Sequence, residues 1–527
     1  MPRLALLSLA AAVAASPVLA QHDHPAGGHA AVGRVSFPTT CAAAVQPAID
    51  RAVAMLHSFW FEEARQTFEQ VAATDPTCAV APWGVAMTFW GNPFVRQPIP
   101  AERVRAGLAA AERAVALAAR ASHRERMYAE AALALWANAD SLDHVERAAR
   151  HEVAMQRLAQ AHPEDPEATL FHGRAIIANA PPEDLEFKRQ RHAATLLAPI
   201  FERQPDHPGV AHYIIHTFDS PGLAVHGLDA ARRYAAIAPA APHALHMPSH
   251  IFTRLGLWDE SIETNRRSAA AEPDSNTAVH PNDYMVYAYL QQGRDADALA
   301  VVRRGREAAD RYYGAILGFN AVAMPARYAL ERSAWQEAAA LPLPRGSAAF
   351  VTAIARFARA VGAARGGDPA GAGAELRALA DLRDTLRAHR DAYWATIVEA
   401  QRLAAQAWVA RADGRDDEAL GLARQAAELE ATVEKHPVTP GPLLPARELE
   451  GDLLLELGRA AEAQRAYEAT LTREPRRARA LYGAARAAER AGDRESARKH
   501  YETLLELMAQ ADASRPEPAA ARTFLGR

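Results

Sequence analysis

The sequence has few of the features that mark nucleic-acid-binding, membrane-spanning or cysteine-ligated metalloproteins. Only two of its 527 residues are cysteine, which excludes a zinc or iron–sulfur site built on cysteines. The formal net charge is −4, so a broad basic surface for nucleic acid is not expected. After the N-terminus, no apolar run reaches the roughly 18 residues of a membrane-spanning helix.

The composition favours helices and leaves one kind of site open. Hydrophobic residues make up 50% of the chain, mostly alanine and leucine, although only 7% of the residues are aromatic. Alanine and leucine, with the abundant arginine and glutamate, are good helix formers, so an all-α fold is expected. The chain also contains 21 histidines, so a histidine-based site is not excluded.

The N-terminus predicts export. A basic start is followed by an apolar run that ends in small residues at Ala20. This pattern is typical of a secretory signal peptide over residues 1–20, cleaved near Ala20; the alternative is a short membrane anchor. We therefore expect a periplasmic or secreted protein with no membrane span after cleavage. Residues 21–40, which contain several histidines and glycines, are expected to form a disordered linker.

The sequence repeats itself with a period of 34 residues. Near the C-terminus a turn glycine, a small helix residue and an aromatic residue recur at this spacing: Gly458 and Gly492, Ala463 and Ala497, Tyr467 and Tyr501. These are the marks of the tetratricopeptide repeat (TPR), a pair of antiparallel helices. We therefore predict a TPR-type solenoid of helical hairpins, wound as a right-handed superhelix, rather than three or four separate domains.

Interruptions in the repeat pattern suggest how the solenoid is divided. A proline- and glycine-containing stretch follows residue 340, and a proline-rich segment lies at 436–445. We expect an N-terminal solenoid over 41–340 with a histidine-lined groove, a C-terminal solenoid over 341–512, and a flexible tail over 513–527.

The two cysteines are placed for a disulfide. Cys41 lies just before the first helix of the first repeat, and Cys78 lies at the end of that repeat. These two ends meet in an antiparallel helix hairpin, and an oxidising compartment favours the bond. The alternative is two free buried thiols.

Histidines recur at equivalent positions of two consecutive repeats. His212 and His216 are each followed 34 residues later by another histidine, His246 and His250. A pair at i and i+4 projects from one helix face and can share a metal ion. In the TPR register these pairs occupy positions 5 and 9 of the first helix, which lines the concave groove. Pro248 can kink the second of these helices.

The same register adds residues to the candidate site. The metal-ligand candidates are His212, His216, His243, His246, His250, His280 and Asp283. The candidates for supporting or groove-lining roles are His57, Tyr213, Asp219, Arg254 and Tyr287. Zinc, copper, iron and nickel all accept imidazole ligands, so the metal stays open. Two alternatives also stay open: histidines that hydrogen-bond an anionic peptide or small molecule, and purely structural hydrogen bonding between repeats.

The chain resembles the TPR superfamily over most of residues 41–510. The segments HPGVAHYIIHTFD and HALHMPSHIFTRLGLWDESI also resemble a group of bacterial secreted TPR proteins. The resemblance implies an all-α superhelix that binds a protein or peptide, and it implies no catalytic residues. Two hypotheses follow. The first is an exported peptide-binding scaffold with an embedded histidine metal site. The second is a metal-dependent oxidoreductase or hydrolase, so whether the chain is an enzyme stays open.

Overall fold

A computed structural model describes residues 31–95, 99–272, 278–309 and 315–527. The expected signal peptide, residues 1–20, lies outside these ranges, as does the start of the expected linker. Within them the regular structure is helical, without a strand. None of the described helices has the length and apolar character needed to cross a membrane. The all-α expectation is confirmed.

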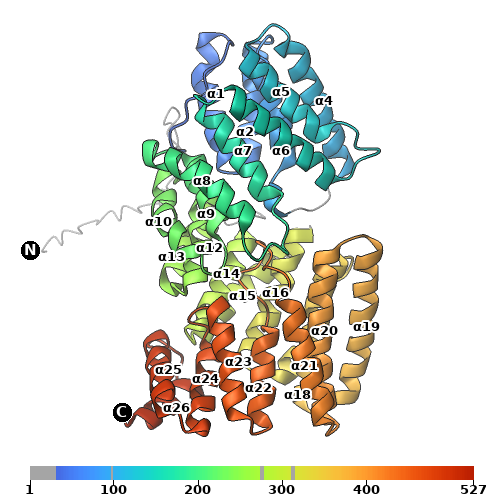
Figure 1. Ribbon diagram of the computed structural model, residues 1–527, viewed down its shortest axis with the longest axis vertical. Helices are drawn as coiled ribbons and strands as arrows, with labels where there is room; N and C mark the ends of the chain where they lie inside the picture. Colours follow the sequence, from blue (N-terminus) through green and yellow to red (C-terminus); the bar gives the residue numbers. More distant parts are fainter. Residues whose placement is uncertain (1–30, 96–98, 273–277, 310–314) are drawn as a thin grey trace, which may run out of the picture.

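The N-terminal helices form the upper part of the molecule in Figure 1. They are α1 (Gln46–His57), α2 (Phe61–Thr74), α3 (Val80–Trp90), α4 (Ala101–Ala118), α5 (His123–Trp136), α6 (His144–Ala161), α7 (Pro166–Ala178) and α8 (Lys188–Arg203). Short 3-10 turns flank them at Ala43–Val45 and Pro93–Val95. The starts of α5 and α6 are fixed by capping boxes, in which Ser122 pairs with Glu125 and Asp143 with Glu146.

The middle of the chain carries the histidine motifs. Its helices are α9 (Pro208–Phe218), α10 (Leu228–Ile237), α11 (Pro242–His246), α12 (Pro248–Leu255), α13 (Trp258–Ala271), α14 (Val279–Gln291), α15 (Asp295–Ala309), α16 (Ala315–Glu331) and α17 (Trp335–Ala339), with a 3-10 turn at Ala224–Gly227.

The C-terminal helices form the lower part. They are α18 (Ala349–Gly366), α19 (Pro369–Ala388), α20 (Ala392–Ala412), α21 (Asp416–Glu430), α22 (Ala446–Glu456), α23 (Ala460–Arg473), α24 (Ala478–Ala491), α25 (Arg494–Leu507) and α26 (Pro516–Leu525).

Successive helices pack as antiparallel hairpins, so the fold is a helical-hairpin solenoid of the TPR type. Small residues permit the close approach within each hairpin. A Cβ atom added at Gly451 of α22 would lie 2.9 Å from the ring of Tyr467 on α23. At the hairpin turns, Gly256 and Gly492 end α12 and α24 in the left-handed region, which glycine adopts without strain.

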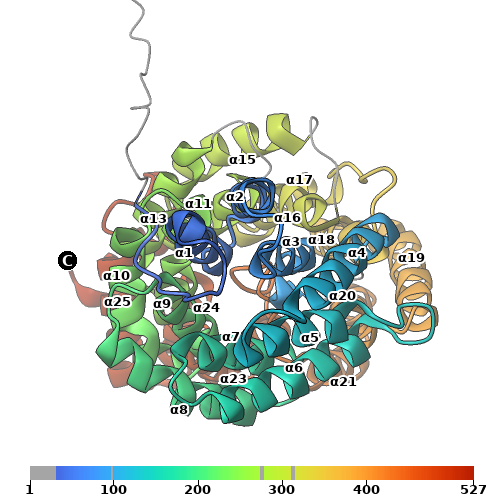
Figure 2. The same cartoon turned by 90° about the horizontal axis from the view of Figure 1, so that it is seen from above.

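The solenoid turns back on itself. Seen from above, the helices wind around a common centre (Figure 2). The last helices, α24–α26, share a hydrophobic core with α13 and α14. Two hydrogen bonds to backbone carbonyls connect these parts of the chain. Asp512 N–H donates to the carbonyl of Gly293 at 3.0 Å, and the side-chain Nε1 of Trp258 donates to the carbonyl of Arg476 at 3.3 Å.

Three expected boundaries differ from the structure. Residue 340 is no break in packing, because α16 and α17 share one core with α18. The expected flexible tail contains α26, whose Phe524 ring contacts Tyr501. The described end of the expected linker is also packed, since Phe37 is fully buried and stacks on Trp83. In each case apolar side chains pack against helices from other parts of the chain. A local sequence pattern does not reveal such packing.

The cysteines form the expected disulfide. Cys41 and Cys78 are bonded, and their Cα atoms lie 4.8 Å apart. Asp75 supports the same junction by accepting the backbone N–H of Ala42 at 2.8 Å. The bond ties the start of α1 to the end of the hairpin that α1 forms with α2.

Residues 431–445, which connect α21 to α22 and are called the central segment below, lie inside the solenoid. The segment contacts parts of the chain that are far apart in sequence. Glu434 N–H donates to the carbonyl of Pro182 at 2.9 Å, and Arg327 donates to that of Pro442 at 2.9 Å. The proline-rich stretch expected as an interruption therefore fills the space toward which the histidine helices face.

Candidate metal centre

The candidate histidines form two groups of three. The first group, called triad one, consists of His212 and His216 on α9 and His243 on α11. The second group, triad two, consists of His246, His250 and His280, from α11, α12 and α14. In each triad, one ring nitrogen from every histidine lies within 4.8 Å of the other two. The two sequence pairs are thus the starting points of two sites rather than one four-histidine site.

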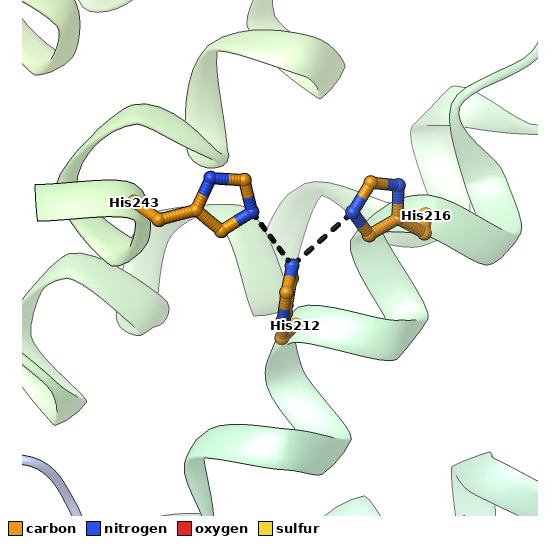
Figure 3. A group of neighbouring side chains, drawn as sticks. All are labelled: His212, His216 and His243. Carbon is orange, nitrogen blue, oxygen red and sulfur yellow. Dashed lines mark hydrogen bonds between the residues drawn. The ribbon is translucent and has the colours of Figure 1, made fainter. Parts of the chain in front are cut away.

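In triad one the three rings converge on one atom (Figure 3). His212 Nε2 lies 3.1 Å from His216 Nε2 and 3.1 Å from His243 Nε2. The Nδ1–H of His212 donates to the backbone carbonyl of His57 at 2.6 Å, so its Nε2 carries a lone pair. A single lone pair can accept one N–H well, whereas two other imidazole nitrogens point at it.

In triad two, the hydrogen-bond partners determine which ring nitrogen of His246 and of His250 carries the hydrogen. His246 Nδ1 lies 2.6 Å from the side-chain oxygen of Asn265, whose amide orientation is fixed because its nitrogen donates to the Ser261 carbonyl at 2.7 Å. His250 Nδ1 lies 2.8 Å from a carboxylate oxygen of Asp219. Because both acceptors lack a proton to donate, each Nδ1 carries the hydrogen and each Nε2 carries a lone pair.

These two lone pairs face each other. His246 Nε2 and His250 Nε2 are 3.0 Å apart. Lone pairs at this distance repel unless a cation lies between them. Two nitrogens that bind one ion at about 2.0–2.1 Å and lie about 3 Å apart subtend an angle of about 95° at the ion. This arrangement suits a transition metal ion and does not distinguish the four metals.

A proton shared between these two nitrogens would not replace that cation, because the surroundings disfavour a positively charged histidine ring. Burial lowers the pKa of His246 well below its ordinary value, and the neighbouring His280 and His250 lower it further. Burial also lowers the pKa of His250, although Asp219 partly offsets the effect. In triad one, burial and neighbouring histidines lower the pKa of all three members. Neutral imidazole is the form that binds metals.

Helix geometry keeps the second pair together across a break. Pro248 starts α12, so α11 and α12 are separate helices. Met247 between them nevertheless keeps right-handed helical dihedrals (φ −54°, ψ −34°), and His250 N–H donates to its carbonyl at 3.1 Å. His246 and His250 therefore stay on one face, as they would on an uninterrupted helix.

Asp219 orients His250 and is itself held by cations. Its carboxylate accepts from Arg254 Nε at 2.9 Å and from Lys435 Nζ at 3.2 Å. Burial alone would raise the pKa of Asp219, but Lys435, Arg254 and His250 lower it well below the usual range. The ionised carboxylate thus fixes the ring that would bind the metal, as carboxylates commonly do beside ligating histidines. Arg254 also pairs with Glu434 of the central segment.

A third group of metal-capable side chains, His57, Glu167 and His207, supports triad one. His57 Nε2–H and His207 Nε2–H donate to the two oxygens of Glu167, each at 2.7 Å. His57 Nδ1 contacts the Tyr213 hydroxyl at 2.8 Å, and His207 Nδ1 accepts the backbone N–H of Gly209 at the start of α9. Burial would raise the pKa of Glu167, but the two histidines lower it. Every ring nitrogen has a partner, so the cluster holds α9 in place.

Two of the expected residues lie elsewhere. Asp283 does not join either triad, because it is fully buried against Arg327 (3.2 Å) and Asn320 (3.1 Å). Tyr287 points toward Glu474 and Arg477. Both residues occupy the expected repeat positions, but they contact buried arginines instead of the triads. These arginines are Arg327 on α16 and Arg477 just before α24. The register counts positions within one repeat and carries no information about partners from distant helices.

Several contributing residues had no sequence signal. Glu167 lies on α7, Asn265 lies on α13, and Lys435 comes from the central segment. His207 caps α9, and the proline that follows it at the first helical position is the local signal that could have located it.

A cavity of about 280 Å³ adjoins the triads and is lined by five of their six histidines. The remaining wall is mostly apolar: Phe59, Trp60, Phe61, Val95, Pro242, Met247, Pro281, Pro437 and Val438, with Asn92, Ser268 and Glu272 as its other polar members. The cavity therefore brings together the turn between α1 and α2, the histidine helices and the central segment.

Comparisons with known proteins assign no family to the chain. No protein-family model matches the chain, and no curated protein matches it. A solved structure described as an IFIT1 monomeric mutant with Gppp-AAAA superposes with a TM-score of 0.38 and 11% identity, covering 88% of this chain and 90% of that chain. A human IFIT1 dimer with PPP-AAAA gives a TM-score of 0.37 and 12% identity, over 87% and 90%. At such TM-scores the likeness indicates nothing about the site.

Proposed function

We propose that this protein is an exported helical scaffold that holds transition metal ions in two tris-histidine sites. The observation that carries the proposal is the pair of facing lone pairs on His246 and His250, 3.0 Å apart. Their orientation follows from the Asn265 and Asp219 acceptors. Triad one supports it with three converging Nε2 atoms.

The burial of the histidines favours metal binding over peptide binding. His212, His246 and His250 are at most 2% exposed, so a peptide lying on the solenoid cannot reach them. The central segment occupies the adjoining space, and its Pro437 and Val438 line the cavity. A protein or peptide partner of this scaffold would therefore dock on another surface.

Three protein ligands per ion leave coordination positions open, as in catalytic rather than closed structural metal sites. A metal bound there can polarise a ligand or activate water. An enzymatic role is therefore compatible with the site, and zinc, copper, iron and nickel stay candidates.

The proposal is tested by metal content. Tag-free protein, reconstituted with each of the four metals and desalted, is analysed by mass spectrometry. We expect two ions per chain for the wild type. Substitution of one triad, as in H212A/H216A or H246A/H250A, should reduce this to one.

The matched control is H123A/H162A. It removes a histidine pair whose ring nitrogens also lie 3.1 Å apart, but on the surface. The control should keep two ions, and circular dichroism should show equal helix content in all variants. A wild type without stoichiometric metal, or triad variants that keep both ions, would refute the proposal.

A further inference from the structure

The two triads lie as close to each other as their own members do. Between triads, the ring centroids of His216 and His250 are 5.8 Å apart and those of His243 and His246 are 6.1 Å apart. Within triads the corresponding distances run from 4.5 to 6.5 Å. Ions in the two sites would therefore face one shared space, which is the apolar cavity.

Given the metal sites proposed above, we propose that this cavity binds a small aromatic molecule that carries one oxygen donor, with the donor directed at the metal pair and the ring against the aromatic wall. The inference rests on the proposed metal sites and adds the class of ligand that they take.

The wall is suited to an aromatic ring. Phe59 already stacks on His243 with ring centroids 5.2 Å apart and an interplanar angle of 21°, and it contacts His212 edge-on at 4.5 Å. Phe61 stacks on Phe59 at 5.0 Å. Aromatic rings prefer offset-stacked and edge-to-face neighbours of this kind.

Few polar side chains line the wall beside the histidines, and two of their oxygens are already hydrogen-bonded within the protein. Ser268 Oγ already donates to the Pro242 carbonyl at 2.8 Å. Asn92 Oδ1 already accepts the backbone N–H of Phe94 at 2.9 Å. A ligand with many hydrogen-bonding groups would leave them unpaired here, at a cost in affinity.

The charge of the cavity wall does not narrow the class of ligand, but its size does. The described residues of the wall include Glu272 and no lysine or arginine, so a bound anion would be held by the metal ions alone. The volume of about 280 Å³ lies at the lower end of small-molecule sites. This volume is large enough for a substituted aromatic ring and too small for a folded protein.

The experiment uses 4-fluorophenol as the probe, observed by fluorine NMR. Cobalt(II) is paramagnetic, so its presence near the probe shortens the fluorine relaxation time. We expect strong relaxation enhancement with the cobalt-loaded protein and none with the zinc-loaded or metal-free protein. Azide, which binds open metal positions, should displace the probe. The same measurement with 4-fluorotoluene, which has no oxygen donor, should show an effect at least tenfold smaller.

A cavity-filling variant locates the probe. Val438, 4% exposed on the central segment, lines the cavity, and its backbone carbonyl accepts from Asn320 Nδ2 at 2.9 Å. V438F should keep two cobalt ions and lose the relaxation effect. If V438F binds less cobalt than the wild type, the variant cannot locate the probe. Displacement of the probe by azide in the wild type then tests whether the probe binds at the metals.

The outcomes separate the two proposals. A wild type that binds no cobalt overturns the metal sites themselves. A wild type that binds cobalt but leaves the probe unaffected, or a V438F variant that relaxes the probe as strongly as the wild type, overturns this inference and leaves the metal sites standing. Equal effects from 4-fluorophenol and 4-fluorotoluene overturn the ligand class.

Discussion

The orientation of single imidazole rings decides the chemistry of this protein. Each of His212, His246 and His250 gives its Nδ1 hydrogen to a fixed acceptor: a backbone carbonyl, an amide oxygen or a carboxylate. This leaves Nε2 available toward the centre of each triad. A packing histidine such as His151 differs, because its Nε2 is buried with no partner and no second ring nitrogen faces it.

Asp219→Asn is the residue-scale test of this arrangement. The amide oxygen can still accept the His250 hydrogen, but the negative charge that makes the ring a better ligand is lost. In the H212A/H216A background, where only triad two remains, we expect metal affinity to fall about 10–100-fold. A cobalt titration followed by visible absorbance measures it.

Glu434→Gln is the matched control. Glu434 pairs with Arg254, as Asp219 does, but touches no histidine of the triads. Its substitution disturbs the same charge cluster and should change the affinity less than threefold. Equal losses in the two variants would mean that the charge cluster as a whole, rather than the bond to His250, sets the affinity.

At the scale of elements, the position of α9 against α1 sets triad one. The contact has no spare room, since a Cβ atom at Gly209 would lie 2.6 Å from His57 Nδ1. His57 cannot easily yield, because Glu167 and Tyr213 hold both of its ring nitrogens. The backbone carbonyl of His57 in turn accepts from His212. A shift of α9 would therefore reach the rings of triad one directly.

Gly209→Ala should force that shift. We expect the free energy of unfolding to drop by about 1–3 kcal/mol, typical of overpacking, and triad one to bind metal more weakly than it does without the substitution. Denaturant unfolding and cobalt titration of the H246A/H250A background measure the two effects. Gly421→Ala is the control: Gly421 lies within α21 with nothing near its added Cβ, so the substitution should be neutral or stabilising. Unchanged metal binding in the Gly209 variant would contradict the coupling.

At the scale of the whole molecule, closure of the solenoid completes the site. The central segment supplies Lys435 to Asp219 and Val438 to the cavity wall. Arg327 from α16 holds the same segment through its contact with Pro442. The C-terminal helices pack on α13 and α14, so the site depends on chain segments from both ends of the molecule.

The disulfide secures the opposite end of this closed structure. Replacing both cysteines, as in C41S/C78S, removes a bond that closes 37 residues of chain. We expect the free energy of unfolding to fall by about 3–4 kcal/mol, because the unfolded chain gains conformational freedom. Urea unfolding without reductant measures it.

Metal content should stay at two ions per chain, since α1 is also held by the surrounding hydrophobic core. The wild type treated with reductant should match the variant. A variant as stable as the untreated wild type would show that the bond does not constrain the unfolded state.

The sequence by itself determined the local parts of this protein. Helix-forming composition and the 34-residue period predicted helical hairpins. The spacing of Cys41 and Cys78 predicted their bond. The histidine pairs predicted ligands on one helix face, because residues four apart on a helix share a face wherever that helix lies.

Only the tertiary structure decided how these parts combine. It divides the histidines into two triads by adding His243 to one and His280 to the other. It removes Asp283 from the site by pairing it with Arg327. It also places the central segment inside the solenoid and returns the last helices to the middle of the chain. These outcomes depend on how far each hairpin rotates relative to the next and on contacts between side chains 31 to 216 residues apart, which a periodic pattern cannot encode.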